Sequence, residues 1–364
     1  MKKFDYKTLN HLKLTNSIVN KLNKIYEIRG QTVSYQAEAI EVLERLTEVA
    51  KIQSTDASNR IEGIYTTDSR LKKIVESKVE PHNRSEAEIS GYRDVLKLIH
   101  ENYTYMPVSK NTILAMHKQL FEYTGDSWGG QFKDTNNQII TKYADGSEEI
   151  RFTPPAALIT PELVEQLCAA YDQAVERSDF SPLILAGAFI FDFVSIHPFK
   201  NGNGRMSRLL MLLTLYKTGF DVGKYISLEK IIEETKPSYY ETLKQSSAGW
   251  NDNQNDYEPF LDYFLGVIVK AYWLFEERLG IVGHQSLSAS KLVIKILRQE
   301  LRPLSMSELS EKIPQFSKIT IQRTVRKLRD EQRIEMIGKG KNTKYILKRL
   351  FKVILSDSTS NHPK

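Results

Sequence analysis

The run from His197 to Arg208, HPFKNGNGRMSR, holds the residues best suited to chemistry. An imidazole has an unperturbed pKa of about 6.5, so His197 can accept a proton from a hydroxyl near neutral pH. Gly202 and Gly204 let backbone N–H groups converge on an anion, and the helix that follows adds unpaired N–H groups. Arg205 and Arg208 share one face of its first turn and suit phosphate oxygens. The pattern indicates a base beside a phosphate-binding turn, and hence chemistry on a nucleotide.

The flanks of this run predict two buried helices joined by a loop. Residues 181–193 are strongly apolar, and residues 206–215 are apolar again over a helical length. Asn-Gly pairs also favour β-hairpin turns, but neither flank alternates with the period of two that strands require. The remaining alternative is an ordinary helix–helix connection, which would not need the histidine or the arginines.

Most of the chain before residue 280 predicts helices. Apolar side chains three or four apart predict a helix over residues 37–61. Ser85 and Glu88 are spaced as a capping box for a helix that reaches about Asn102. Further helices are expected to begin at Ser109, Thr160 and Ser181.

One segment, residues 129–154, breaks the helical pattern. It contains a turn at residues 145–146 between two β-rich runs, the first of which is Gln138, Ile139, Ile140 and Thr141. This arrangement predicts a β-hairpin. Because the hairpin precedes His197, we expect a flap over the motif rather than a decorative insertion.

The fixed positions His-Pro-Phe-x-x-Gly-Asn-Gly-Arg-x-x-Arg resemble the signature of the Fic family, enzymes that transfer AMP from ATP to protein hydroxyls. The resemblance covers about residues 35–265 and implies a mainly α fold, a helical core with a β-hairpin flap. It implies that His197 takes the proton from a target Ser, Thr or Tyr. Residues 138–141 resemble the strand that holds a target segment by strand addition.

The same resemblance assigns the nucleotide contacts. ATP would bind at Lys200, Asn201, Gly202, Asn203, Gly204, Arg205 and Arg208. Asn203 and the N–H groups of Gly202 and Gly204 would hold the α- and β-phosphates. Arg205 would bind the β-phosphate and Arg208 the γ-phosphate. Transfer of UMP or phosphate is an alternative, but Gly204 favours AMP because phosphorylating relatives usually carry lysine there.

Asn201 departs from the family pattern, which has Asp or Glu at this position to ligate Mg²⁺. Asparagine offers only a neutral carbonyl oxygen, whereas Mg²⁺ prefers anionic ones. The expected substrate and cofactor are therefore ATP and Mg²⁺, with Asn201 as a weak metal ligand.

Ser58, Glu62 and Gly63 fit the family's inhibitory pattern, Ser/Thr-x-x-x-Glu-Gly/Asn. The alternative is a helix that ends in a solvent-facing glutamate. A carboxylate paired with Arg208 would neutralise the group expected at the γ-phosphate. We therefore expect an autoinhibited adenylyltransferase that modifies a target protein and itself. Some relatives use this glutamate to remove AMP, so the resemblance also allows the reverse reaction.

The C-terminal part is basic. Residues 285–364 contain 18 Lys and Arg against 7 Asp and Glu, and the rest of the chain 33 against 38. Residues 288–348 predict three helices and two strands, similar to a winged helix-turn-helix. The side chains expected to contact DNA phosphates are Arg323, Arg326, Lys327, Lys339 and Lys341. Docking to a protein is an equal alternative.

These features predict four segments along the chain. A helical region with the inhibitory motif spans 1–104, a Fic core 105–280, a winged helix-turn-helix 285–350 and a tail 351–364. The single cysteine, Cys168, cannot form an internal disulfide, and no apolar run is long enough to cross a membrane. We expect a cytoplasmic protein that forms a homodimer and contacts a target protein and double-stranded DNA. The alternative function is a DNA-binding regulator whose core senses nucleotide.

Overall fold

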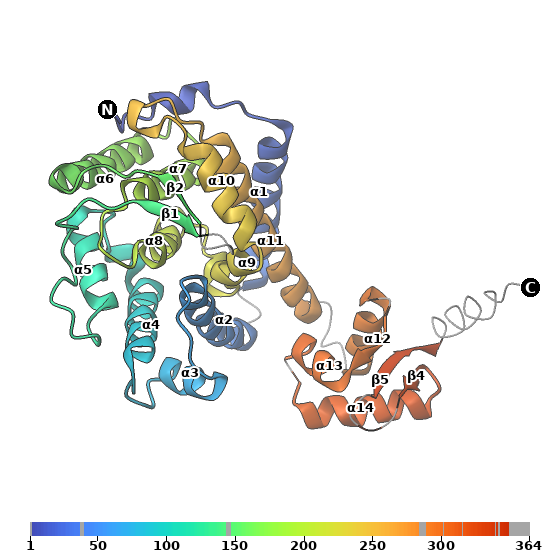
Figure 1. Ribbon diagram of the computed structural model, residues 1–364. Coiled ribbons are helices and arrows are strands. Elements are labelled where there is room, and N and C mark those ends of the chain that lie inside the picture. The colour runs from blue at the N-terminus through green and yellow to red at the C-terminus, as the bar shows by residue number, and fades with distance from the viewer. Residues whose placement is uncertain are drawn as a thin grey trace, which may run out of the picture. The chain divides into compact units, whose positions relative to one another are not determined.

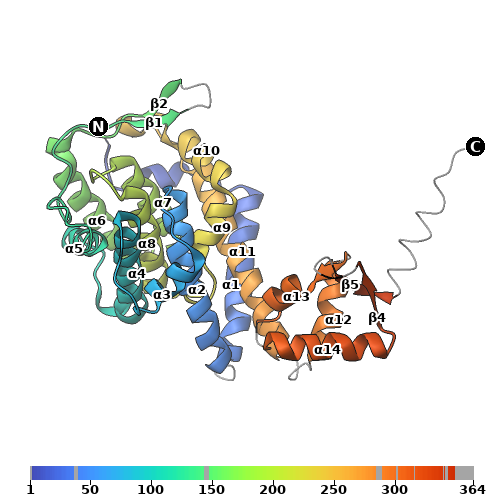
Figure 2. The ribbon, with the colours of Figure 1, turned by 60° about the horizontal axis from the view of Figure 1, so that its bottom comes forward.

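The computed structural model describes residues 2–36, 40–142, 147–283, 289–300, 302–314, 316–338, 340 and 343–348. Helices dominate this part of the chain, as Figures 1 and 2 show. The described residues also form one two-stranded and one three-stranded sheet. The mainly α architecture expected from the sequence is confirmed. The chain divides into two compact units, Met1–Glu276 and Glu277–Lys364. The division falls inside helix α11 (Glu258–Gly283), and the predicted segments 1–104 and 105–280 lie almost wholly in the first unit.

Two helices at the centre of the first unit carry the motif. They are α7 (Pro182–Ile196) and α8 (Asn203–Lys217), which pack against each other. Nearly every side chain of both is buried, which is typical of helices enclosed on all sides by a core. Helices α6 (Thr160–Arg177) and α5 (Lys110–Leu120) pack beside them. The loop between α7 and α8 is thereby held at both ends by buried helices.

Helix α2 (Ile40–Ile61) brings the predicted inhibitory segment to this core. Its apolar stripe, which includes Leu43 and Leu46, is buried against α4 (Arg84–Asn102) and α9 (Leu228–Glu234). Gly63 follows the helix with a φ of 78°, a left-handed conformation that favours glycine and ends helices. The predicted helix over residues 37–61 ends at Ile61 as expected, and Glu62 follows α2 directly.

The capping box expected at Ser85 and Glu88 is wrong. Helix α4 begins at Arg84, and its N-cap is Asn83, whose Oδ1 accepts a hydrogen bond from the Glu86 N–H at 3.0 Å. Because the helix starts earlier than the spacing suggested, Glu88 lies beyond the capping position. Its carboxylate is free to bind other groups.

The predicted hairpin is present. Strands β1 (Ile139–Lys142) and β2 (Glu148–Phe152) pair antiparallel, with an irregular register between Ile139 and Ile140. The expected turn at Asp145 and Gly146 lies outside the described residues. Strand β2 contacts α10 (Lys236–Ser247), so the hairpin is attached to the helical core.

The remaining elements of the first unit are short or peripheral. They are η1 (Lys7–His11), α1 (Asn16–Gln36), α3 (Asp68–Val75), η2 (Tyr103–Tyr105), η3 (Ala157–Ile159), η4 (Val222–Lys224) and η5 (Trp250–Asp252). The single cysteine, Cys168, is buried with a free thiol. Across the described residues, no helix combines the length and the apolar character that crossing a bilayer requires.

The second unit has its own core. Helices α12 (Ala289–Glu300), α13 (Met306–Lys312) and α14 (Lys318–Asp330) bury residues such as Leu297, Leu309 and Val325. Its sheet has the order β3-β5-β4, formed by Leu304–Ser305, Lys344–Leu347 and Ile334–Ile337. The sequence predicted the three helices and the last two strands. It missed β3, because a strand of two residues leaves no periodic pattern.

Candidate active site

His197 ends α7 and opens the motif loop. Its backbone is left-handed (φ 49°, ψ 60°), and its N–H donates to the Phe193 carbonyl at 3.2 Å. Burial lowers the pKa of His197 to about 4, and the positive charge of Lys133 adds to this effect. The imidazole is therefore neutral at pH 7 and able to accept a proton.

Asn203 locks the motif loop rather than reaching outward. Its Oδ1 accepts a hydrogen bond from the Phe199 N–H at 2.9 Å, and its Nδ2 donates to the Phe199 carbonyl at 2.7 Å. Both polar groups of the side chain are thus used within the loop. Phosphate binding by Asn203 and the two glycines stays a prediction. The backbone N–H groups in the first turn of α8, which include that of Asn203, have no intrahelical acceptor.

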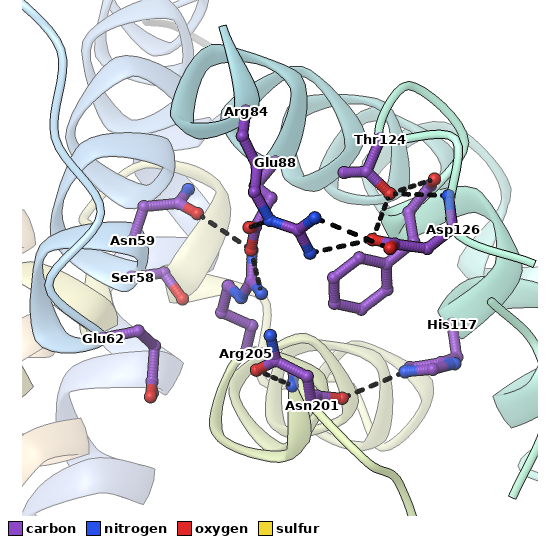
Figure 3. Close-up of polar contacts among 12 residues, drawn as sticks. Ser58, Asn59, Glu62, Arg84, Glu88, His117, Thr124, Asp126, Asn201 and Arg205 are labelled. Carbon is purple, nitrogen blue, oxygen red and sulfur yellow. Dashed lines mark hydrogen bonds and ion pairs between the residues drawn. The ribbon is translucent and has the colours of Figure 1, made fainter. Parts of the chain in front are cut away.

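His117 is a buried histidine that supports the loop. Its ring stacks on Phe199 with centroids 3.7 Å apart and planes within 4°. Nδ1 accepts a hydrogen bond from the Gly130 N–H at 2.9 Å, so Nε2 carries the proton and donates to the Asn201 carbonyl at 3.1 Å. Figure 3 shows this last contact. Burial lowers the pKa of His117 to about 4, which keeps this tautomer neutral.

Arg208 binds the end of α2 through Nε and one terminal nitrogen. Its Nε donates to Ser58 Oγ at 2.8 Å, one terminal nitrogen donates to the Ser58 carbonyl at 2.8 Å, and the same nitrogen pairs with Glu62 Oε1 at 2.8 Å. The Arg208 side chain is 2% exposed, while that of Glu62 is 32% exposed. Burial raises the pKa of Glu62, but the charge and hydrogen bond of Arg208 outweigh it and hold that pKa below its usual value. The carboxylate is ionised at pH 7.

Glu62 also lies against the glycine turn. A Cβ atom at position 204 would overlap Glu62 Oε1. The carboxylate therefore occupies the space next to the first turn of α8, where the sequence predicts phosphates. Gly63 has no such contact and serves the turn that follows the helix.

Arg205 lies beside Arg208 but has a different partner. One of its terminal nitrogens pairs with Glu88 Oε2 at 2.6 Å, and the other donates to Asn59 Oδ1 at 3.4 Å. Its guanidinium carbon lies 5.1 Å from the centre of the Phe121 ring. The side chain is 1% exposed. The expected contact between Arg205 and the β-phosphate would therefore have to be made from this buried position. It would use guanidinium N–H groups that face the protein interior.

Asn201 does not offer the ligand set of a carboxylate-held Mg²⁺. Its Oδ1 accepts a hydrogen bond from the neighbouring Gly202 N–H at 2.7 Å. Among the described residues, no group of three or more His, Cys, Asp or Glu side chains is placed to hold a metal ion. Lys200, the remaining motif residue expected at ATP, is exposed to solvent.

Lys133 joins the flap segment to the motif, which sequence reasoning missed. Its N–H donates to the Pro198 carbonyl at 2.9 Å, and its Nζ donates to the Ile196 carbonyl at 3.1 Å. Burial lowers the pKa of Lys133 to about 8. The expected target-binding strand begins five residues later: Gln138 is exposed, Ile139 is half-buried and Ile140 is 39% exposed. Thr141 pairs with Glu149, and its side chain lies outside the described set.

The residues expected at DNA all belong to the second unit. Arg323, Arg326 and Lys327 are exposed on α14, opposite its buried face. Lys339 and Lys341 lie outside the described residues.

Comparison with known proteins places this geometry in a family. The model of the Fic/DOC family matches residues 107–215. A Fido domain-containing protein of Dictyostelium discoideum is 35% identical over 112 residues, which cover 28% of this chain and 76% of that protein. The chain belongs to the Fic/DOC family.

Longer relatives and solved structures agree with this placement. The "Protein adenylyltransferase Fic" of Nematostella vectensis is 28% identical over 253 residues, which cover 66% of this chain and 52% of that protein. The chain thus spans about half the length of that relative. The crystal structure of a Fic family protein from Desulfovibrio desulfuricans has the same fold, with a TM-score of 0.60, 22% identity, and coverage of 92% of this chain and 96% of that one.

Proposed function

We propose that the chain is an autoinhibited protein adenylyltransferase, which transfers AMP from ATP to a Ser, Thr or Tyr hydroxyl of a target protein and of itself. The observation that carries the proposal is the motif loop. It holds a neutral, half-buried His197 next to the N-terminus of α8, where Arg208 is buried. The family membership and the name of the Nematostella relative support the same activity.

In the proposed reaction, the target hydroxyl oxygen attacks the α-phosphorus of ATP and the bond to the departing pyrophosphate breaks. His197 accepts the hydroxyl proton, for which a neutral imidazole is required. Unpaired N–H groups at the start of α8 and the arginines of its first turn stabilise the negative charge of the phosphates. No step is assigned to a metal, because Asn201 does not provide a carboxylate ligand.

Inhibition follows from the position of Glu62. Its carboxylate takes the Arg208 donors that a γ-phosphate would use, and it places negative charge beside Gly204. An anionic phosphate brought to this place would be repelled. ATP that still binds would adopt a pose unsuited to in-line attack. The same ionised carboxylate could orient water for removal of AMP, which we propose as the reverse activity.

The test is the Glu62→Gly variant, incubated with labelled ATP. We expect self-modification to rise roughly tenfold or more, because one charge-assisted hydrogen bond to Arg208 is removed and such bonds contribute about 1.5–3 kcal/mol. Adding His197→Ala should abolish the labelling. Glu76→Gly is a matched control, since Glu76 also follows a helix directly but pairs with Lys78. Equal labelling of Glu62→Gly and the unmodified chain would contradict the autoinhibition.

We propose DNA binding as a second function, located in the second unit. Helix α14 is amphipathic, with Ile321, Val325 and Leu328 buried and the basic side chains on the opposite face. Together with α13 and the strands β4 and β5, this is the order of a winged helix-turn-helix. Such a basic face suits phosphates of a duplex.

A further inference from the structure

Glu88 is a buried carboxylate that links the motif to the surface of the first unit. Its Oε2 pairs with Arg205 at 2.6 Å, and its Oε1 accepts a hydrogen bond from Arg84 Nε at 3.1 Å. Arg84 in turn pairs with Asp126 at 2.8 Å. Figure 3 shows this series of ion pairs running from the motif through α4 to the residues that follow α5. The Glu88 side chain is 7% exposed, whereas that of Arg84 is 56% exposed.

Arg205 depends on Glu88 for its position. A buried guanidinium without a carboxylate partner is strongly unfavourable. Glu88 supplies the only ion pair that Arg205 makes among the described residues, and the contact with Asn59 is long at 3.4 Å. Because Arg84 also binds Glu88, a second guanidinium holds this carboxylate in place on α4.

The pairing leaves part of Arg205 available. A guanidinium has five N–H donors in a rigid fork. The hydrogen bond to Glu88 uses one terminal nitrogen, and Nε is buried without a hydrogen-bond partner among the described residues. An unpaired buried donor beside the first turn of α8 is a group that an anionic ligand would satisfy.

We propose that Glu88 is a positioning residue for the nucleotide site, which holds Arg205 so that its free donors meet the β-phosphate. This inference rests on the proposed function. It gives two carboxylates opposite roles. Glu62, 32% exposed at the end of α2, competes with the nucleotide for Arg208. Glu88, enclosed within α4 and shared with Arg84, remains bound to Arg205 when nucleotide enters.

The experiment compares binding of ADP and AMP to the full chain by titration calorimetry, in the Glu62→Gly background. ADP has a β-phosphate and AMP has none, so their affinity ratio reports on Arg205. We expect Glu88→Gln to weaken ADP binding about tenfold, the effect of removing one charge-assisted hydrogen bond, and to leave AMP binding unchanged. Glu88→Asp, which keeps the charge, should restore part of the ratio.

Glu86→Gln is the matched control. Glu86 lies on the same helix, is 3% exposed and pairs with Arg70 at 2.6 Å, away from the motif. The Glu86→Gln variant should lower the melting temperature as Glu88→Gln does, but it should leave the ratio of ADP to AMP affinity unchanged. If Glu88→Gln fails to fold, the test is the comparison of Glu88→Asp with the Glu62→Gly parent. The shorter aspartate side chain should displace Arg205 and therefore lower the ratio of ADP to AMP affinity.

Three outcomes would overturn the inference. One is an unchanged ADP-to-AMP ratio in the Glu88 variants. Another is a rise in self-modification in Glu88→Gln, which would make Glu88 a second inhibitory carboxylate. In both cases the Glu62→Gly parent still binds nucleotide, and the proposed function stands. If that parent binds neither ADP nor AMP, the proposed function fails together with the inference.

Discussion

At the residue scale, the properties of this site depend on the partner that each charged or amide side chain binds. Arg205 and Arg208 each have a carboxylate partner, so the two positive charges of the motif are neutralised when no nucleotide is bound. Asn201 differs from the family pattern, because its side chain offers a neutral oxygen where the pattern has a carboxylate. Its Oδ1 accepts from the Gly202 N–H, a bond that a carboxylate would also make. The loop should therefore tolerate an acid at this position.

We expect Asn201→Asp to increase the apparent affinity for Mg²⁺. A carboxylate oxygen is the ligand that Mg²⁺ prefers, and one added anionic ligand corresponds to a change of about tenfold. The measurement is a Mg²⁺ titration of AMP transfer in the Glu62→Gly background, with and without the substitution. An unchanged midpoint would remove the idea that Asn201 weakens metal binding.

At the element scale, the motif loop is a short connection held by helices from three parts of the chain. α7 and α8 fix its two ends, α5 supplies His117 beneath Phe199, and α2 closes it from the side of Arg208. The stacked ring and two hydrogen bonds of His117 set the position of the Asn201 carbonyl. The base and the arginines therefore depend on packing between helices.

His117→Gln should lower stability at pH 7 by about 2 kcal/mol, since the ring stacking is removed and one hydrogen bond weakens. The substitution should also reduce the sensitivity to acid. The pKa of His117 is about 4 in the folded chain against an ordinary 6.5. As the pH falls, the unfolded chain therefore binds this proton before the folded chain does. The contribution of His117 to the free energy of unfolding is complete above pH 6.5, and it falls by about 1.4 kcal/mol per pH unit between pH 6.5 and 4.

Chemical denaturation between pH 4.5 and 7.5 measures this dependence. The curve of His117→Gln should be flatter than that of the parent. It should not be flat, because both proteins keep His100 and His197, two half-buried histidines with lowered pKa values. His82→Gln is the control, because His82 is exposed before α4. Parallel curves for His117→Gln and the parent would show that protonation of His117 does not limit stability in acid.

At the scale of the whole molecule, the two compact units differ in charge. Residues 285–364 carry the excess of Lys and Arg, while the rest of the chain has more Asp and Glu than Lys and Arg. Such a basic segment attracts polyanions, which suits the proposed contact with DNA. The nucleotide chemistry and the proposed DNA contact would thus use separate surfaces.

Replacing Arg323, Arg326 and Lys327 with glutamate should weaken binding to duplex DNA and flatten its salt dependence. Every phosphate that is no longer neutralised by the protein reduces the slope by about one. Fluorescence anisotropy with a random duplex from 50 to 200 mM salt measures both. The control replaces Lys72 and Lys73 of α3, which lie in the first unit. If the unmodified chain does not bind duplex even at low salt, α14 has another partner.

The sequence alone predicted the chemistry of residues 197–208 and the end of α2. These signals are local, because glycines at defined positions, the helix periods and the spacing of Ser58 and Glu62 each lie within one or two turns of helix. Family resemblance added the expected link between Glu62 and Arg208, whose contact spans 146 positions of the chain.

Only the tertiary structure decided which residues support that motif. Glu88 bonds Arg205 across 117 positions, and His117 bonds Asn201 across 84. The sequence predicted only a helix-capping role for Glu88 and a position within a helix for His117. A single residue in a sequence does not indicate which distant side chain it will contact. Burial and packing between helices select that partner. The same packing binds the Asn203 side chain to the backbone of Phe199, a contact that the sequence did not predict.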